Sequence, residues 1–599
     1  MTAGDSASEV NGVDVERLRE KYRAERDRRR EHPRDDRFDL TGSLARYLED
    51  PYTPRSDREP VHRHVDVAVI GAGLGGLMVA AQLREIGVKS IALIDAAGDV
   101  GGVWYWNRYP GAMCDIESLI YLPLIEELGR IPRHKYALAA DILAHAQAIA
   151  THYGLYEHAL LQTRVSDLRW NDDRQLWRID TDRTDELTAQ FVVIANGPLS
   201  KPKLPGAPGL EQFEGHSFHS SRWDYDYTGG SATSPMTNLS DKVVGVVGTG
   251  ATAVQCIPPL GRDSKQLLVF QRTPSTIGVR NNRELDTAEV ARWRTGWQRE
   301  RIINFTSLLA GAHVEQDLVD DGWTDMYRDI FYRPDYGSMD AVERARAIER
   351  ADFAKMEAIR ARIDSIVQDS ATAESLKPYY AYLCKRPCFH DEYLSTFNRS
   401  NVTLVDTHGQ GITRINSKSV EVGDQTFELD CLIFATGFEF NTAYTHRIGF
   451  DATGRDGVSL TEKWKNGIAS LHGFTTHGFP NLFIMPGPNS QAVVTENFGH
   501  SIGDNARHVA YIVDQVRERG ATTVEVTQLG EDDWVNTIIR NRRDDRAFLE
   551  ACTPGRGNME GAPAERPPQN TNYGLGSLAF YELLQQWRAT DALAGLELT

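Results

Sequence analysis

Twice along the chain, a short apolar run leads into a glycine-rich turn, then into a helical pattern, and then into a second apolar run. The first passage covers residues 65–95 and the second covers residues 242–273. Short apolar runs bounded by glycine are typical of strands buried in a parallel sheet, and the helix between them supplies the crossover. Both passages therefore predict a βαβ unit, and we predict an α/β protein with two Rossmann-like dinucleotide-binding domains.

The first glycine-rich turn has the spacing of a dinucleotide-binding fingerprint. Gly71 would make the tight turn, Gly73 would let backbone N–H groups approach a pyrophosphate, and Gly76 would let helix and strand pack closely. The following helix, predicted over 77–86, would point its positive N-terminal end at the phosphates. Asp95 closes the second strand, where a carboxylate can accept hydrogen bonds from ribose hydroxyls.

The second turn, residues 248–253, differs from the first at the end of its second strand. There the chain has Arg272 and Thr273 in place of an acid. A carboxylate at this point suits the free 2′-hydroxyl of FAD or NAD, whereas a guanidinium accommodates the 2′-phosphate of NADP. The two sites are therefore predicted to bind FAD first and NADP second.

Weaker patterns predict the remaining elements. Helices are predicted over 15–22, 136–153 and 578–587, strands over 191–197 and 430–438, and one more strand and loop over 481–499. The strand at 430–438 echoes the one at 191–197, because each ends in a small-residue turn, and both are predicted to end beside the flavin nucleotide. Prolines and a glycine predict a linker over 199–206, and Gly, Pro and Asn predict a mobile stretch over 552–576.

A long charged stretch at 339–369 has apolar residues at helical spacing and predicts an inserted helical subdomain. The insertion would either form a wall or lid over the substrate or be purely structural. The predicted order along the chain is an N-terminal helical extension (1–60), an FAD domain (61–205), an NADP domain (206–280), the helical insertion (281–374), a second part of the NADP domain (375–429) and a second part of the FAD domain (430–599).

Composition narrows the class of protein. The length of 599 residues predicts two to four domains, and the formal net charge of −18 argues against general nucleic-acid binding. Six cysteines in so long a chain do not indicate a disulfide framework, so we predict a reducing compartment. Cys384 and Cys388 lack zinc-ribbon spacing, so we predict no metal site. No segment reads as a membrane span or a signal peptide, which predicts a cytoplasmic protein without a membrane partner. The sequence does not indicate an oligomeric state.

Two longer motifs carry a family resemblance. Residues 213–224, between the two glycine-rich turns, fit F-x-G-x-x-x-H-x-x-x-W followed by Pro or Asp, and residues 101–115 fit G-G-x-W-x-x-x-x-Y-P-G-x-x-x-D. With the two turns in this order, the chain from about residue 65 onward resembles the type I Baeyer–Villiger monooxygenases. The first motif is met by Phe213, Gly215, His219, Trp223 and Asp224, and the second by Gly101, Gly102, Trp104, Tyr109, Pro110, Gly111 and Asp115.

The resemblance implies an FAD- and NADPH-dependent enzyme that uses O₂ to insert an oxygen atom beside the carbonyl of a ketone. The reaction would pass through a flavin C4a-peroxide and give a lactone or ester. Arg386 is implied to stabilise the peroxide anion, because a permanently charged guanidinium beside a developing anion is strongly stabilising in a dry pocket. Asp115 would hold Arg386 in place, and Lys385 would grip the 2′-phosphate together with Arg272 and Thr273.

The same resemblance assigns the remaining contacts. His219 and the rest of its motif are implied to couple the two domains, and His219 is not expected to act as a general base. The residues implied to bind FAD are Gly71, Gly73, Gly75, Gly76, Asp95, Val103, Trp104, Asp115, Tyr121 and Val165. The residues implied to bind NADP are Met113, Gly248, Thr249, Gly250, Ala251, Thr252, Ala253, Arg272, Thr273 and Lys385.

The chain departs from the family pattern at two places. Met113 stands where many members have Arg or Gln. Residues 552–555, which lie nearest to the family's N-S-W-Y loop, contain no tryptophan, and this puts the loop's contact with the nicotinamide in doubt. The N-terminal extension and Met113 resemble the branch that acts on bulky ketones, such as macrocyclic, steroid or polycyclic terpenoid ketones.

Three other functions stay open on the sequence alone. A flavin monooxygenase that oxidises N or S atoms has a similar first motif, but it lacks the ending formed here by Trp223 and Asp224. An NADPH-dependent disulfide reductase needs a redox cysteine pair beside the flavin, usually C-x-x-x-x-C, and the chain has none at that position. A redox-sensing scaffold is the non-enzymatic alternative, and a ketone that accelerates NADPH oxidation would exclude it.

Overall fold

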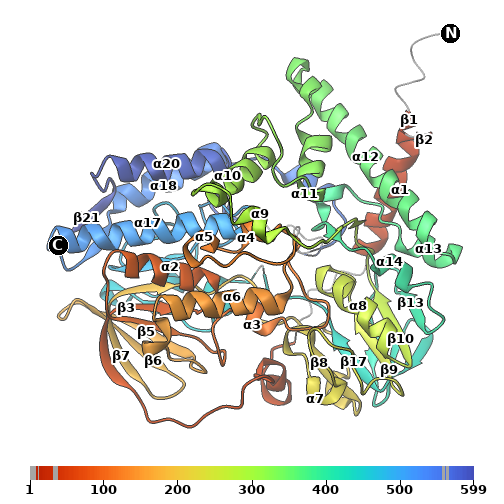
Figure 1. Cartoon of the computed structure of the whole chain (residues 1–599), viewed down its shortest axis with the longest axis horizontal. Coiled ribbons are helices and arrows are strands. Elements are labelled where there is room, and N and C mark those ends of the chain that lie inside the picture. Colours follow the sequence, from red (N-terminus) through yellow and green to blue (C-terminus); the bar gives the residue numbers. More distant parts are fainter. Residues whose placement is uncertain (1–8, 11, 32–37, 441, 556–559, 561–565) are drawn as a thin grey trace.

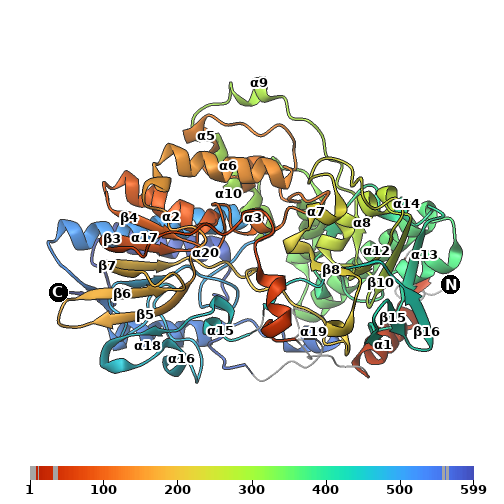
Figure 2. The same ribbon diagram turned by 90° about the horizontal axis from the view of Figure 1, so that it is seen from below.

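The computed structural model describes residues 9–10, 12–31, 38–440, 442–555, 560 and 566–599. Two sheets lie side by side, the first at the left and the second at the right of both views (Figure 1 and Figure 2). Each predicted glycine-rich turn directly follows an inner strand of one sheet, β3 (His62–Ile70) in the first and β9 (Val243–Val247) in the second. The predicted α/β class and its two Rossmann-like units are therefore confirmed.

The first sheet has the strand order β18-β5-β6-β7-β3-β4, and β19 also pairs with β7. β3 is parallel to both of its neighbours, whereas β5, β6 and β7 form an antiparallel meander. Helix α2 (Leu74–Glu85) follows the first turn and packs against the long C-terminal helix α17 (Phe498–Glu518). The other strands are β4 (Ile91–Ile94), β5 (Val165–Asn171), β6 (Leu176–Thr181), β7 (Glu186–Ile194), β18 (Ala452–Thr453) and β19 (Leu482–Ile484).

The second sheet is wholly parallel and has the order β13-β10-β9-β17-β8. Helix α8 (Ala251–Asp263) follows the second turn and connects β9 to β10. The remaining strands are β8 (His216–His219), β10 (Gln266–Gln271), β13 (Val402–Asp406) and β17 (Cys431–Phe434).

The position of β17 corrects one prediction. We placed the strand at 430–438 in the FAD domain, ending beside the flavin, but β17 pairs with β9 and β8 in the second sheet. The similarity to residues 191–197 is confirmed, because each sheet has one apolar strand that ends in a small-residue turn beside its glycine-rich turn. Both strands have the same apolar pattern, so only their pairing reveals which sheet each one joins. The return to the first sheet falls after β17, at β18.

The inserted segment is helical, as predicted, and in Figure 1 it extends from the upper centre to the right. Its main helices are α10 (Trp297–Leu309), α11 (Gly322–Met326) and α12 (Ala341–Ile366), followed by α13 (Ser370–Leu376). The N-terminal helix α1 (Val15–Arg30) packs on α12, where Val15 and Leu18 meet Phe353. A single core cluster runs from α2 through α8 into α12, and this continuity fixes the insertion against both dinucleotide-binding units.

Several boundaries differ from the predictions. Helix α2 begins at Leu74 instead of residue 77. The aromatic stretch at residues 104–106, within the 101–115 motif, lies in the helical turn α3 (Val103–Trp106). Helices α6 (Ala139–His152) and α20 (Ser577–Ala589) agree with the predicted spans. Residues 556–559 and 561–565 of the predicted mobile stretch lie outside the described residues. Among the described helices, none combines the length and the apolarity that crossing a bilayer requires.

Candidate functional site

The first glycine-rich turn is walled by backbone atoms. Gly71 has φ +110°, and a Cβ there would come within 2.8 Å of the Ala195 carbonyl oxygen. A Cβ on Gly76 would come within 1.8 Å of the Gly71 oxygen, and one on Gly102 within 2.7 Å of the Gly73 Cα. Only glycine fits these positions. No described side chain caps α2 at Gly73, so the first N–H groups of the helix are free to meet an anion.

Asp95 and the aromatic residues lie around this turn. The Asp95 carboxylate accepts hydrogen bonds from the Ala72 and Ala97 amides at 2.6 and 2.8 Å, and its burial raises its pKa. Trp104 donates its indole N–H to the Tyr121 hydroxyl at 2.8 Å, which joins two of the predicted FAD residues. Val103 begins α3, Gly75 lies in the first turn of α2, and Val165 begins β5 with its side chain buried.

The second turn repeats this construction. Gly248 has φ +116°, and a Cβ there would come within 2.6 Å of the Ala435 oxygen, as Gly71 does with Ala195. Gly250 is the N-cap residue of α8, and no described side chain caps the helix there. The Thr249 hydroxyl donates to the Thr273 carbonyl at 2.7 Å. The buried Thr273 hydroxyl itself has no hydrogen-bond partner among the described residues, and it stands next to Arg272. The helix that starts at Ala251 also carries Thr252 and Ala253.

Gln255 on α8 joins the two dinucleotide-binding units. Its side-chain oxygen accepts hydrogen bonds from the Tyr109 hydroxyl at 2.9 Å and the Met113 amide at 3.3 Å, and its nitrogen donates to the Met113 carbonyl at 2.9 Å. Gly111, with φ +82°, lies so close that a Cβ would come within 2.5 Å of the Gln255 carbonyl oxygen. The Met113 backbone is thus held by the helix of the second turn. Sequence reasoning did not identify Gln255.

Arg386 and Asp115 form a bidentate ion pair across 271 residues of chain. The two guanidinium nitrogens donate to the two carboxylate oxygens at 2.7 and 2.6 Å. Burial among protein atoms opposes the charge of Arg386, but the attraction of Asp115 outweighs it and raises the pKa of the guanidinium. The Asp115 side chain is 7% exposed while that of Arg386 is 40% exposed. The arginine is therefore fixed on one side and open on the other.

The helical insertion reaches this pair. The indole N–H of Trp323, on α11, donates to the Asp115 carbonyl at 3.0 Å, and its ring lies 5.4 Å from the Arg386 guanidinium. The insertion is thus part of the wall around the ion pair, which supports the first of the two alternatives predicted for it. Sequence reasoning missed Trp323, because nothing in its local pattern distinguishes it from a packing residue.

Lys385 lies between the ion pair and the second turn. It donates to the Pro554 carbonyl at 2.9 Å, and burial together with the positive charge of Arg272 lowers its pKa to about 7. A disulfide joins the neighbouring Cys384 to Cys552, with 5.2 Å between the Cα atoms. This bond corrects our interpretation of the cysteines, since one pair does form a bridge. The two cysteines are 168 residues apart, so no local spacing in the sequence predicts their pairing.

Replacing Cys552 with serine is expected to lower the free energy of unfolding by about 2–4 kcal/mol, because the bridge closes a long loop. Denaturant unfolding of the variant should be insensitive to reductant, whereas that of the wild-type protein should fall to the variant's level when reductant is added. Ester formation from a ketone should survive, because the bridge is not a redox pair beside the flavin. A variant that forms no ester but still oxidises NADPH at the wild-type rate would contradict a purely structural role for the bridge.

The 213–224 motif is anchored in the second sheet. His219 is fully buried; its Nε2 donates to the Gly437 carbonyl at 2.9 Å, and its Nδ1 accepts from the Ser221 amide at 3.2 Å. Burial and the charge of Arg222 lower the pKa of His219 to about 3, so the imidazole is neutral and structural. Asp224 caps the short helix α7 (Tyr225–Thr228). Phe213 and Trp223 are buried, and Gly215 lies against the Phe213 ring.

The same motif contacts the aromatic stretch of the first unit. The Arg222 guanidinium lies 3.5 Å from the Trp106 ring centroid, and the Trp223 amide donates to the Tyr52 hydroxyl at 3.0 Å. The Tyr52 hydroxyl in turn donates to the Trp106 carbonyl at 3.1 Å. These contacts physically connect the two units, which agrees with the coupling that the resemblance implies.

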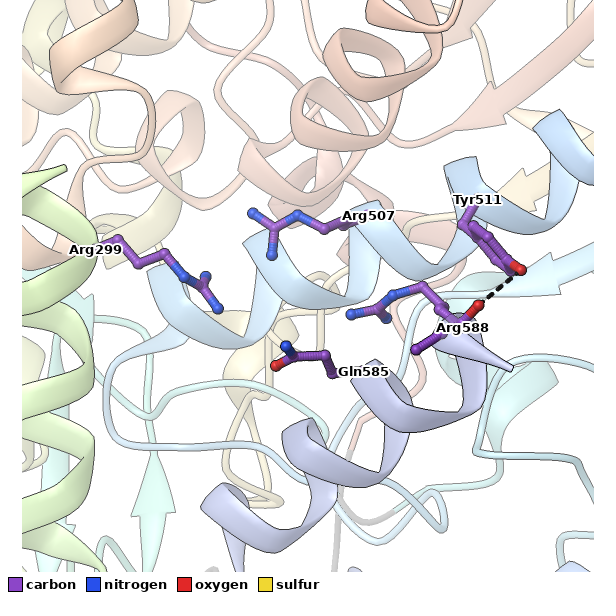
Figure 3. A pocket seen from close by; sticks show the side chains of 6 residues that line it. Arg299, Arg507, Tyr511, Gln585 and Arg588 are labelled. Carbon is purple, nitrogen blue, oxygen red and sulfur yellow. Dashed lines mark hydrogen bonds between the residues drawn. The ribbon is translucent and has the colours of Figure 1, made fainter. Parts of the chain in front are cut away.

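An open hollow of about 520 Å³ lies elsewhere, among helices α10, α17 and α20. Figure 3 shows the Arg299, Arg507 and Arg588 guanidinium groups turned toward it. The six residues that line it include none of the predicted site residues. The ion pair of Arg386 and Asp115 lies outside this hollow.

The fold and the site define a protein with two dinucleotide-binding units that meet at a fixed arginine. The family described as pyridine nucleotide-disulphide oxidoreductase matches residues 68–273, which include both turns. The chain is 51% identical to pentalenolactone D synthase of Streptomyces exfoliatus, over 97% of this chain and 100% of the relative. It is 46% identical to a Baeyer–Villiger monooxygenase of Streptomyces coelicolor, over 97% of each chain. The chain belongs to the Baeyer–Villiger monooxygenase family.

Solved structures agree with this assignment. The polycyclic ketone monooxygenase of Thermothelomyces thermophila superposes with a TM-score of 0.90 at 36% identity, over 98% of this chain and 99% of the other. A complex of OTEMO with FAD and NADP superposes with a TM-score of 0.70 at 27% identity, over 90% of this chain and 100% of the other.

Proposed function

We propose that this chain is an FAD- and NADPH-dependent monooxygenase that inserts an oxygen atom next to the carbonyl carbon of a bulky cyclic or polycyclic ketone. Ketone, NADPH, a proton and O₂ are consumed, and a lactone or ester, NADP⁺ and water are formed. Family membership supports the reaction class. The names of the similar proteins, which include a pentalenolactone D synthase and a polycyclic ketone monooxygenase, support the bulky substrate.

The residues around the two turns fit the two cofactors. At the first turn, the glycine cradle and the open N-terminus of α2 suit a pyrophosphate, and Asp95 at the strand end suits the ribose of FAD. At the second turn, the orphaned Thr273 hydroxyl and the Arg272 guanidinium suit the 2′-phosphate of NADPH. When bound, the reduced flavin and O₂ supply the oxygen atom that is inserted.

The ion pair of Arg386 and Asp115 is the observation that carries the proposal. Oxygen insertion places negative charge at the reacting atoms, and a guanidinium already held in position stabilises that charge without reorganising during the reaction. Asp115 uses both carboxylate oxygens to hold the arginine, and Trp323 lies beside it. The partly exposed face of Arg386 is the one available to the substrate and the flavin.

A paired assay tests the proposal against oxidation at N or S. The purified protein is given NADPH with a polycyclic ketone in one reaction and a thioether of similar size in another. We expect the ketone to be converted to a lactone or ester and to accelerate NADPH oxidation. Sulfoxide from the thioether, with the ketone left unchanged, would favour the flavin monooxygenase alternative. A coloured protein that oxidises NADPH at a rate independent of both compounds would favour the redox-sensing scaffold.

The lowered pKa of Lys385 predicts a pH-dependent affinity for NADP⁺. At about 7, the pKa leaves much of the ammonium deprotonated above neutrality in the free protein. A 2′-phosphate favours the protonated form, so binding must take up a proton, and the dissociation constant should rise by up to about tenfold per pH unit above pH 7. In Lys385→Arg the charge is permanent, and the rise between about pH 7 and 9 should nearly vanish. Calorimetric titrations that gave parallel slopes for both proteins would move the 2′-phosphate away from Lys385.

A further inference from the structure

The cations predicted to hold the 2′-phosphate of NADP already hold an anion of the chain itself. The Glu560 carboxylate accepts a hydrogen bond from the Arg272 guanidinium at 2.6 Å and lies 3.7 Å from the Lys203 ammonium. The Glu560 side chain is only 16% exposed. Although burial acts in the opposite direction, the positive charges of Arg272, Lys203 and Lys385 lower the pKa of Glu560, so it is ionised at neutral pH.

The backbone at Glu560 indicates that these contacts hold it there. Its φ of +59° lies in the left-handed region, which residues other than glycine rarely adopt. Its amide donates to the Gly555 carbonyl at 2.8 Å. The local backbone is therefore kept in a conformation that brings the carboxylate to the cations.

A carboxylate and a phosphate bind a guanidinium in the same way. Both accept charge-assisted hydrogen bonds from its fixed N–H groups, so the two anions cannot occupy the same donors at once. A nucleotide with a 2′-phosphate therefore competes with Glu560 for the Arg272 guanidinium. A nucleotide with a free 2′-hydroxyl brings no second anion and does not compete for it.

We propose that Glu560 is an internal competitor for the 2′-phosphate site and that it sets how strongly the protein prefers NADP(H) to NAD(H). The inference rests on the proposed assignment of NADP to the second glycine-rich turn. Arg272, Lys203 and Lys385 favour NADP(H) over NAD(H). Glu560 lowers the affinity for the phosphorylated nucleotide and therefore makes this preference smaller. Lys203, which sequence reasoning assigned to a linker, is a further cation of this site.

Glu560→Gln removes the competing charge and keeps the size of the side chain, and Glu550→Gln is the matched control. Glu550, on α19 (Arg546–Ala551), pairs with Arg546 and not with the cluster. The probes are adenosine 2′,5′-bisphosphate and adenosine 5′-monophosphate, titrated calorimetrically into the FAD-loaded full-length protein. These probes report binding without turnover.

We expect Glu560→Gln to bind the bisphosphate about tenfold more tightly than wild type, as loss of a charge-assisted competitor implies, and the monophosphate equally well. Glu550→Gln should match wild type for both. An unchanged or weaker affinity for the bisphosphate in Glu560→Gln, or an equal gain in affinity for both probes, would overturn the competitor role. Neither result would refute the proposed NADP site. A wild-type protein that binds both probes equally would overturn the 2′-phosphate site itself, and the competitor role with it.

Discussion

Replacing Arg386 with alanine is expected to lower ester formation at least about 100-fold, as the loss of a preorganised charge at a reacting anion does elsewhere. Reduction of the flavin by NADPH should stay within a few-fold of the wild-type rate, because Lys385 and Arg272, and not Arg386, are assigned to the nucleotide. Stopped-flow absorbance of the flavin separates this step from product formation. NADPH that is still oxidised should then yield hydrogen peroxide instead of ester.

The alanine variant also leaves Asp115 as a buried carboxylate without its partner, which can destabilise the protein by several kcal/mol. Arg386→Lys keeps a cation beside Asp115 and therefore provides the control for folding. It should bind flavin normally but lose most of the ester formation, since an ammonium cannot make the bidentate contact and still present an open face. Wild-type ester formation in either variant would refute the role assigned to Arg386.

Replacing Arg272 with alanine is expected to raise KM for NADPH about 10- to 100-fold, which corresponds to the loss of a charge-assisted contact to the 2′-phosphate. KM for NADH should change far less, because NADH carries no phosphate at this position. Steady-state assays with both nucleotides measure the ratio. Arg262→Ala is the matched control, since Arg262 lies at the end of α8 and pairs with Asp263. Equal increases for the two nucleotides would move the phosphate site elsewhere.

Local sequence patterns were enough to predict the parts of the site that are built from a short stretch of backbone. The glycines of both turns are required by contacts within a few ångströms, such as Gly71 against Ala195 and Gly248 against Ala435, and glycine spacing is visible in the sequence. The contrast between Asp95 and Arg272 at the two strand ends was also visible. The pairing of Arg386 with Asp115 followed from the family resemblance, and the structure brings the two side chains into contact.

Contacts between distant segments could not be predicted in this way. β17 has the same apolar pattern as β7, so its sheet is decided by pairing with β9. Cys384 and Cys552 are brought together by the tertiary fold, as are Trp323 and the carbonyl of Asp115. Glu560 stands in a Gly- and Pro-rich stretch whose composition predicts a loop and says nothing of the cations that it meets.

The predicted domain order, apart from the corrected strand β17, and the individual roles of the site residues remain predictions. The substitutions of Arg386, Arg272, Lys385 and Glu560 test separate steps, namely oxygen insertion, nucleotide selection, proton uptake and competition at the phosphate site. Because the first two residues are assigned to different steps, a common loss in both variants would indicate misfolding and not chemistry.

Oxygen-18 labelling shows whether the protein transfers an atom of O₂ to a ketone. The FAD-loaded protein is incubated with NADPH, a polycyclic ketone and oxygen-18 gas, and the product is analysed by mass spectrometry. We expect a lactone or ester with a single labelled oxygen in the newly formed C–O–C linkage and label in the accompanying water. A ketone recovered unchanged, while NADPH is consumed and labelled hydrogen peroxide accumulates at the same rate with or without it, would refute oxygen insertion by this protein.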